Sequence, residues 1–356
     1  YPPEKDFPNF RKNMGPRGVL HCKSDGKGGQ TVVDTGPLTK KRMQTIDDEV
    51  TAKTVDFIKR QNAAGIPFFV WFNTTHMHFR TYAKPESLGQ SGRWQSEYHD
   101  VMIDHDKAIG VLLDLLVELN IVDDTFVMYS TDNGPHCNSW PDAGTTPFRS
   151  EKNTSWEGAY RVPCLIRWPG HIKPGSVSND IVAHLDWLPT LAAIAGAPDI
   201  KEKLLAGHKM GGTTYKVHID GFNQLDHITG KSPSPRPGFV YWTDEGELAA
   251  LRFDNWKCVF MEQRVMGTCL IWAEPLVTLR APKLFNLRTD PYEWADITSN
   301  TYYDWWMSHA FILIAAQPLV AQFLATFVDF PPRQKAASFS LSSVLEKMQQ
   351  TGSGGA

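Results

Sequence analysis

Residues 126–163 place the strongest constraint on the fold, because a short apolar run there leads directly into polar residues of defined chemistry. Residues 126–131 form a largely apolar run with β-branched and aromatic members, which predicts a buried strand. Asp132, Asn133 and Gly134 follow at its carboxyl end. In open α/β sheets ligands bind just beyond the carboxyl ends of strands, and carboxylate and amide oxygens suit a hard cation such as Ca²⁺ or Mg²⁺. We interpret the pair as a candidate cation site. The competing interpretation is a plain turn.

Lys152 lies in a polar loop about twenty residues further on, before another apolar run at residues 161–168. A lysine is a compact cation for an anionic substrate group. His136 and Arg149, from the same stretch, are candidate substrate-binding residues, with an ordinary surface role as the alternative.

The whole string from STDNG to PFRSEKNTSWEGAYRVP resembles the type I sulfatases, the arylsulfatase-like members of the alkaline phosphatase superfamily. The resemblance implies that Asp132 and Asn133 ligate Ca²⁺, with Mg²⁺ as the alternative ion. It also implies that Lys152 binds the sulfate and acts in catalysis. Ala159 stands where the family usually has a second glycine.

Two histidines follow a second apolar run at residues 68–72, which predicts a continuous buried strand. His76 and His78, spaced i, i+2, could bind a metal or protonate a substrate oxygen, and the alternative is a pair of surface histidines. The resemblance implies one substrate-contacting histidine here. His78 is the better match by position and the predicted catalytic residue, and His76 is the second candidate for substrate binding. The proline usual after this histidine is absent.

The bulk properties are those of an ordinary soluble protein large enough for a substantial core. The net charge of −3 and the lack of a basic cluster give no case for a nucleic-acid partner. The five cysteines have no zinc-type spacing and settle neither disulfide state nor compartment. The apolar stretch at 310–327 is predicted to form two packed helices meeting at Pro318 rather than a membrane span.

The remaining pattern predicts an α/β fold with a mixed central sheet flanked by helices, alkaline-phosphatase or sulfatase-like by resemblance. Helices are predicted at 40–62, capped by Thr39, and at 98–119. A small C-terminal domain of short antiparallel strands begins near residue 236. We therefore expect a catalytic-domain portion at 1–235, irregular over 1–37, then the sheet-and-helix subdomain at 236–350 and a flexible tail at 351–356.

The sulfatase nucleophile is a formylglycine made from the Cys or Ser of a C/S-x-P-x-R motif, and no Cys or Ser here fits that motif. The family's Asp-Asp metal ligands are not recognisable either. Both are expected upstream of Tyr1, so the chain is interpreted as a fragment of a sulfuric ester hydrolase, inactive alone.

An aryl sulfate is the first expectation for the substrate and a sulfated sugar the second. The family favours a periplasmic or secreted location. The alternatives are a phosphodiesterase or phosphonate monoester hydrolase of the same superfamily, and a non-catalytic scaffold.

Overall fold

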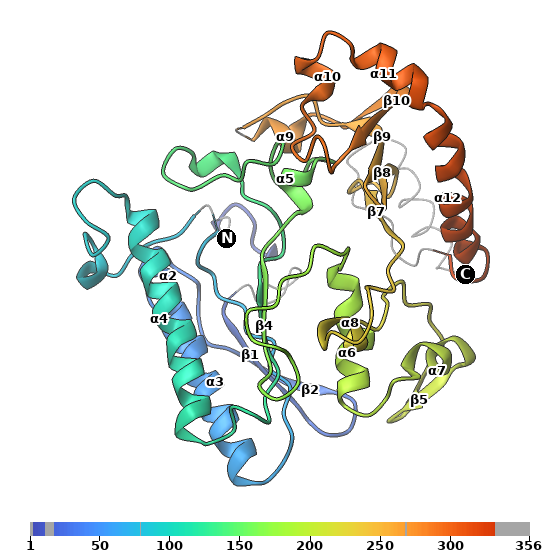
Figure 1. Ribbon diagram of the computed structural model, residues 1–356. Coiled ribbons are helices and arrows are strands. Elements are labelled where there is room, and N and C mark those ends of the chain that lie inside the picture. Colours follow the sequence, from blue (N-terminus) through green and yellow to red (C-terminus); the bar gives the residue numbers. More distant parts are fainter. Residues whose placement is uncertain (1–2, 11–17, 79, 268, 332–356) are drawn as a thin grey trace. The chain divides into compact units, whose positions relative to one another are not determined.

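The computed structural model describes residues 3–10, 18–78, 80–267 and 269–331, which form two compact units (Figure 1). Unit 1 comprises residues 1–125 with 141–143 and 209–214, and unit 2 comprises 126–140, 144–208 and 215–356. The domain boundary predicted at residue 235 lies within unit 2. The predicted tail, 351–356, lies outside the described residues.

The core of unit 1 is a pair of helices that run side by side, α3 (Ile46–Ala63) and α4 (Glu97–Glu118) (Figure 1). The helix predicted at 40–62 begins as expected at Thr39, whose hydroxyl accepts the backbone N–H of Arg42 at 3.2 Å. It forms in two pieces, because α2 (Lys40–Met43) ends before α3 begins. Apolar side chains at helical spacing on α3 and α4 are buried: Ile46, Ile58, Val101, Leu115 and Leu116.

The prediction that residues 1–37 are irregular is wrong for residues 20–34. β1 (Leu20–Ser24) and β2 (Gln30–Asp34) form an antiparallel hairpin. Its turn is fixed by the Asp25 carboxylate, which accepts the backbone N–H groups of Lys27 at 2.8 Å and Gly29 at 2.9 Å. Every residue of both strands is exposed, so the hairpin has no buried face and the sequence shows no alternation to reveal it.

The predicted buried strand at 68–72 is also not found. The segment has no strand partner among the described residues, and Phe69 and Trp71 are 68% and 79% exposed. An apolar run becomes a strand only where a neighbouring backbone supplies hydrogen-bond partners.

The predicted strands at 126–131 and 161–168 form, in shorter form, as β3 (Val127–Ser130) and β4 (Cys164–Arg167). The burial predicted for the first strand is wrong, because every residue of β3 is partly or fully exposed. They pair antiparallel, with Val127 opposite Arg167 and Ser130 opposite Cys164. Phe126 anchors this pair, since its ring packs edge-on against Trp168 at a centroid distance of 5.7 Å. Asp132 and Asn133 therefore follow β3 after a single residue, Thr131.

The predicted C-terminal meander is confirmed as a four-stranded antiparallel sheet in the order β10-β9-β8-β7. The strands are β7 (Gly238–Trp242), β8 (Leu248–Phe253), β9 (Trp256–Glu262) and β10 (Val277–Asn286). One buried cluster of this sheet surrounds Trp156, which belongs to the loop that carries Lys152. A second cluster packs the sheet against the long helix α12 (Phe311–Asp329).

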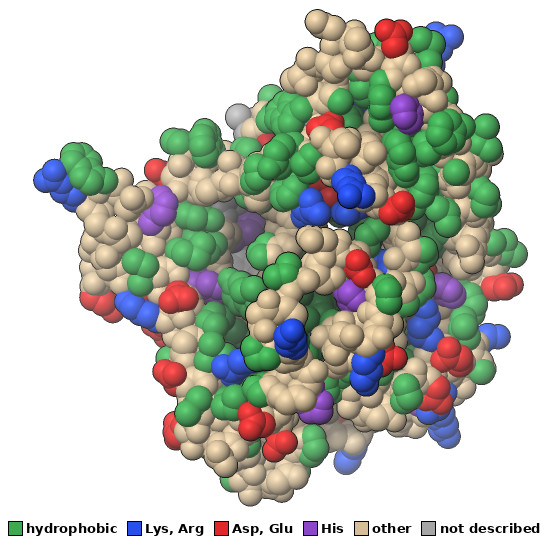
Figure 2. Space-filling model, viewed as in Figure 1, with side chains coloured by type: hydrophobic (Ala, Val, Ile, Leu, Met, Phe, Trp, Pro, Cys, Tyr) green, Lys and Arg blue, Asp and Glu red, His purple; other side chains and the backbone are tan. Residues whose placement is uncertain are grey.

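The helix α12 is continuous, so the prediction of two helices meeting at Pro318 is wrong. Pro318 is exposed, as is Ile314 at 68%, so water can satisfy the Ile314 carbonyl that a Pro318 N–H would otherwise have bonded. Within the described part of the chain, α12 is the one helix long and apolar enough to cross a membrane, judged on length and composition alone. Its buried Ile312 and Ala316 contact the sheet, while apolar side chains stand out on its outer surface (Figure 2).

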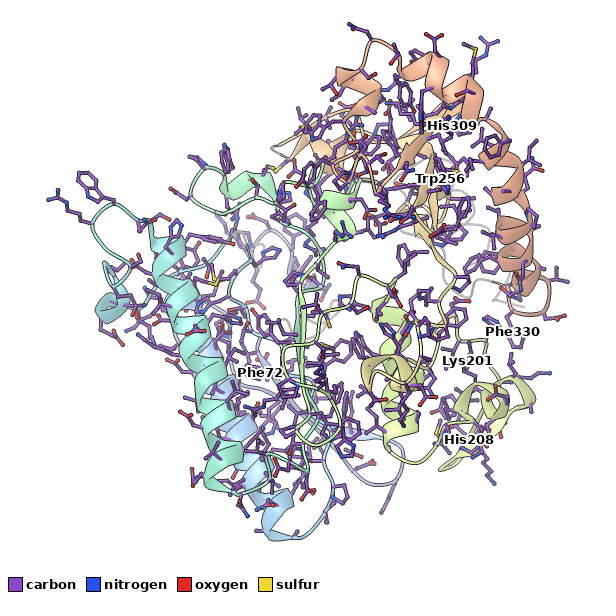
Figure 3. The ribbon with its side chains drawn as sticks, in the orientation of Figure 1. Phe72, Lys201, His208, Trp256, His309 and Phe330 are labelled. Atoms are coloured by element: carbon purple, nitrogen blue, oxygen red, sulfur yellow. The ribbon has the colours of Figure 1, made fainter. Side chains whose placement is uncertain are left out.

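At the start of α12, aromatic rings from neighbouring elements gather against the sheet. Trp256 of β9 lies 5.9 Å, between ring centroids, from His309 of α11 (Tyr302–His309) (Figure 3). The remaining elements are short: α5 (Glu157–Tyr160), α6 (Trp187–Ile194), α7 (Ile200–Ala206), β5 (His208–Met210), β6 (Thr213–Tyr215), α8 (Leu225–Ile228), α9 (Leu270–Ala273) and α10 (Ala295–Thr298).

Candidate functional site

A large cavity of about 2110 Å³ within unit 2 is lined by Asp132, Asn133 and Lys152 together. The two loops that carry them are joined by a backbone hydrogen bond of 2.9 Å from the Lys152 N–H to the Pro135 carbonyl. The sequence-predicted cation ligands and the predicted anion-binding lysine therefore face one space.

The atoms at the end of β3 are those a hard cation requires. The Asn133 side-chain nitrogen donates to the Gly134 carbonyl at 2.8 Å, which leaves the amide oxygen free to act as a ligand. The Asp132 side chain is exposed to the cavity, and its Oδ1 has the Thr131 hydroxyl 3.4 Å away. Calcium takes about 6–8 oxygen ligands, so two side chains form part of a shell. Across the described residues, no group of three or more His, Cys, Asp or Glu side chains is arranged to hold a metal.

Position 134 requires glycine, because the backbones of the two loops approach closely there. A Cβ built on Gly134 would lie 1.8 Å from the carbonyl oxygen of Gly158. The Gly134 N–H also donates to the Ala159 carbonyl at 2.8 Å. Gly158 is equally confined, because its own Cβ would lie 2.3 Å from the Arg149 carbonyl oxygen. The loop after β3 and the loop around Lys152 thus pack backbone against backbone.

The backbone around Lys152 is strained. Ser150 and Asn153 on either side of it have positive φ values of 66° and 67°. Such conformations cost non-glycine residues about 1–3 kcal/mol and persist where the surroundings impose them. Here the Asn153 side chain is held by the Ile271 carbonyl, to which its Nδ2 donates at 2.7 Å. Strain concentrated beside one cavity-lining lysine is typical of a functional loop.

Glu151, next to Lys152, is fully buried and ties three segments together. Its carboxylate accepts the backbone N–H of Cys137 at 2.6 Å and that of Gly267 at 2.5 Å. The first contact holds the loop after β3, and the second holds the segment before α9. Lys152 is therefore positioned by the glutamate that precedes it.

The C-terminal sheet holds the other end of the loop through buried charges. Lys257 is fully buried between two carboxylates, with its Nζ 3.1 Å from Glu157 and 2.7 Å from Glu293. Glu293 also accepts the Glu157 backbone N–H at 2.7 Å. Burial alone would raise the pKa of Glu157, but the charges of Lys257 and Arg252 outweigh it and lower that pKa. The loop of Lys152 is thus fixed onto β9 at Glu157.

The ammonium group of Lys152 has no hydrogen bond or ion pair with the described residues, and it lies beside an aromatic ring. Its Nζ lies 5.7 Å from the ring centroid of Trp272, a residue of α9 that is 51% exposed and lines the same cavity. A cation held over an indole face keeps its N–H donors available for an anion.

Two further sequence candidates lie outside the residues that line the cavity. His136 is engaged within its own loop and with Trp272, whose Nε1 lies 3.1 Å from its Nε2. Arg149 donates to the Glu293 carbonyl and to Asp296, both at 2.8 Å. Its guanidinium thereby ties the loop of Lys152 to α10 and to the segment before it, so we do not carry Arg149 forward as a substrate ligand.

The two candidate histidines of unit 1 occupy different environments. The His76 side chain is 5% exposed, and its Nδ1 lies 3.0 Å from the carboxylate of Asp47, which also accepts the backbone N–H groups of Thr75 and His76. His78 is exposed. The surroundings of His76 suit a structural role, and the exposure of His78 suits contact with a substrate.

Sequence reasoning did not select Trp272, Glu151, the Glu157–Lys257 pair or His184 as parts of the site. The His184 ring places Nε2 2.8 Å from the Thr131 carbonyl oxygen, directly before Asp132. The sequence carries no signal for Trp272, because it lies in an apolar run that resembles any core segment.

Comparison with known proteins identifies the family of this chain. A family profile described as Sulfatase matches residues 6–197. The chain belongs to the sulfatase family. It is 30% identical to human arylsulfatase A over 239 residues, which covers 64% of this chain and 43% of that protein. It is also 30% identical to dog N-acetylgalactosamine-6-sulfatase over 302 residues, which covers 79% of this chain and 53% of the relative.

The sulfatase fold is shown as well. The structure matches the crystal structure of PsFucS1 sulfatase from Pseudoalteromonas sp. with a TM-score of 0.75 and 25% identity, covering 93% of this chain and 62% of that one. This confirms the predicted alkaline-phosphatase-like α/β class with a small antiparallel sheet. The chain spans about half the length of the curated relatives it matches.

Proposed function

We propose that this chain supplies the sulfate-binding half of a sulfuric ester hydrolase active site. The observation that carries the proposal is that Asp132, Asn133 and Lys152 line one cavity, on loops locked together at Gly134. Lys152 contributes a positive charge for the equatorial oxygens of a sulfate ester, and the Trp272 ring beside it leaves the ammonium donors available.

In this proposal Asp132 and Asn133 ligate a Ca²⁺ ion, with Mg²⁺ as the alternative. The bound ion would neutralise charge on the sulfate oxygens. The two side chains fit as oxygen ligands, and the rest of the shell would come from residues beyond these 356. The same holds for a formylglycine nucleophile, because no Cys or Ser of this sequence lies in the C/S-x-P-x-R motif. The family resemblance alone makes His78 the proposed proton donor to the leaving oxygen.

The relatives indicate the substrate class. The proteins to which this chain is similar include an arylsulfatase and an N-acetylgalactosamine-6-sulfatase. We therefore propose a small sulfate ester, either an aryl sulfate or a sulfated sugar, as the substrate.

The test is binding of 4-nitrophenyl sulfate to the 356-residue chain by titration calorimetry with Ca²⁺ present. Lys152→Ala should weaken binding about 10- to 100-fold, the effect of one hydrogen bond to a charged group. Lys173→Ala removes another lysine of the same cavity and serves as the control. Equal affinity of both variants and the parent chain would refute the role of Lys152.

The same purified chain and buffer also test whether the nucleophile lies outside this chain and whether one of the alternative functions applies. Release of 4-nitrophenol from the sulfate ester by the chain alone would contradict an external nucleophile. Preferential binding of bis(4-nitrophenyl) phosphate would favour the phosphodiesterase or phosphonate monoester hydrolase alternative. Absence of binding to either ester would favour a non-catalytic scaffold.

A further inference from the structure

A second constellation of unit 2 consists of a serine, a histidine and an aspartate from segments far apart in the chain. Ser178 and Asp180 lie in the loop after β4, and His227 lies on α8, which packs beside α6 (Figure 1). The Ser178 hydroxyl oxygen is 3.0 Å from His227 Nε2. That distance is within the range for a nucleophile and its general base.

The surroundings of His227 fix which ring nitrogen carries the proton. Nδ1 lies 3.2 Å from the carbonyl oxygen of Ser232, which can only accept a hydrogen bond. The proton therefore resides on Nδ1, and Nε2 presents its lone pair to the Ser178 hydroxyl. This is the tautomer that a general base requires.

Asp180 places a carboxylate on the Nδ1 side of the His227 ring. Its Oδ2 lies 3.6 Å from His227 Nδ1 and accepts the Ser234 backbone N–H at 2.9 Å, which holds the carboxylate in place. A carboxylate on the Nδ1 side stabilises the imidazolium that forms when the ring takes a proton. The Asp180 backbone N–H donates to the Ser178 oxygen at 3.1 Å and stabilises negative charge developing there.

The solvent exposure of the serine and histidine side chains matches the roles of nucleophile and base. The His227 side chain is 9% exposed, whereas Ser178 is exposed, and both line the cavity together with Asp180. The base is shielded from water while the serine oxygen can be reached by a substrate.

We propose that Ser178, His227 and Asp180 form a serine-esterase-type centre that reacts with uncharged carboxylic esters, an activity separate from sulfate ester hydrolysis. The Ser178 oxygen would bond to the ester carbonyl carbon as its proton passes to His227 Nε2. The carbon–oxygen bond to the alcohol would then break, and that proton would leave with the alcohol. Water, deprotonated by the same nitrogen, would release the carboxylic acid and restore the serine.

The test uses a fluorophosphonate probe on the purified 356-residue chain, read by intact mass and peptide mapping. We expect one covalent label at Ser178, none in Ser178→Ala, and labelling about 10²- to 10⁴-fold slower in His227→Gln, the usual contribution of a general base. Ser176 provides a matched control within the chain. It is exposed two residues away, and its hydroxyl donates to the Lys173 carbonyl instead of a histidine, so it should remain unlabelled.

Hydrolysis of 4-nitrophenyl acetate gives the second readout, and Ser178→Ala should remove any rate above the buffer background. Far-ultraviolet circular dichroism of each variant establishes that it is folded. A chain that stays unlabelled would overturn the proposal and leave the Ser178–His227 contact as a tie between the loop and α8. Equal labelling of Ser176 and Ser178, or full labelling of folded His227→Gln, would overturn it as well.

Discussion

Replacing Gly134 by alanine tests whether the two site loops depend on direct backbone contact. The new Cβ would lie 1.8 Å from the Gly158 carbonyl oxygen and 2.8 Å from its carbon. Relief requires the loops to separate by more than an ångström, on the order of the shortfall from an ordinary carbon–oxygen contact. It would also break the 2.8 Å hydrogen bond from Gly134 to Ala159.

The expected cost follows from these two effects. Forced overpacking costs about 1–3 kcal/mol, and loss of a buried hydrogen bond adds about 1 kcal/mol. We therefore expect Gly134→Ala to lower the free energy of unfolding by about 2–4 kcal/mol. A domain of this size loses about 2–4 °C in Tm per kcal/mol, so the melting transition should fall by roughly 4–16 °C.

The assay is urea unfolding followed by tryptophan fluorescence, with Gly144→Ala as the matched control. Gly144 lies in the same unit, and a Cβ there would meet nothing within 4 Å. The control should change stability by no more than about 0.5 kcal/mol. If Gly134→Ala unfolds at the same urea concentration as Gly144→Ala, the close approach of the two loops is refuted.

Three further perturbations probe the loop that carries Lys152. Lys257→Met should destabilise the chain by about 3–5 kcal/mol in urea unfolding, because two buried carboxylates lose their cation; a loss under about 1 kcal/mol would contradict the buried pairing. Ser150→Gly should raise stability by about 1 kcal/mol, because φ is +66° there and the buried hydroxyl has no hydrogen-bond partner among the described residues; an unchanged or lower Tm would show that the strain is absent. The pKa of Glu157 lies below its ordinary value of 4.5, so its stabilising contribution is present above that pH and is lost as the pH falls through the folded-state pKa. Acid unfolding of Glu157→Gln should accordingly depend less steeply on pH below 4.5 than that of the parent chain, and parallel curves would refute this linkage.

Local sequence patterns were sufficient to predict the elements that depend only on neighbouring residues. The cap at Thr39, the strand before Asp132 and the C-terminal meander depend on neighbouring residues, and all three form. Two predictions about strands failed, each for its own physical reason. The exposed hairpin β1–β2 has no buried face to impose alternation, and the apolar segment 68–72 finds no strand partner among the described residues.

The residues of the candidate site likewise fall into those that the sequence could predict and those that it could not. Asp132, Asn133 and Lys152 could be selected from sequence because they stand in one recognisable string, and the structure places all three on one cavity. The interpretation of Arg149 depended on knowing its partner Asp296, which is 147 residues away. The burial of His76 against Asp47 likewise could not be predicted from either segment alone.

The sequence alone determined that a carboxylate, an amide and a lysine of sulfatase type flank one strand, because adjacent residues carry that pattern. Only the tertiary structure decided what surrounds them. Lys257 meets Glu157 across 100 residues, and His227 meets Ser178 across 49. Such pairs form when packing brings distant segments together. No short stretch of sequence predicts them, because the contact depends on how the whole intervening chain folds.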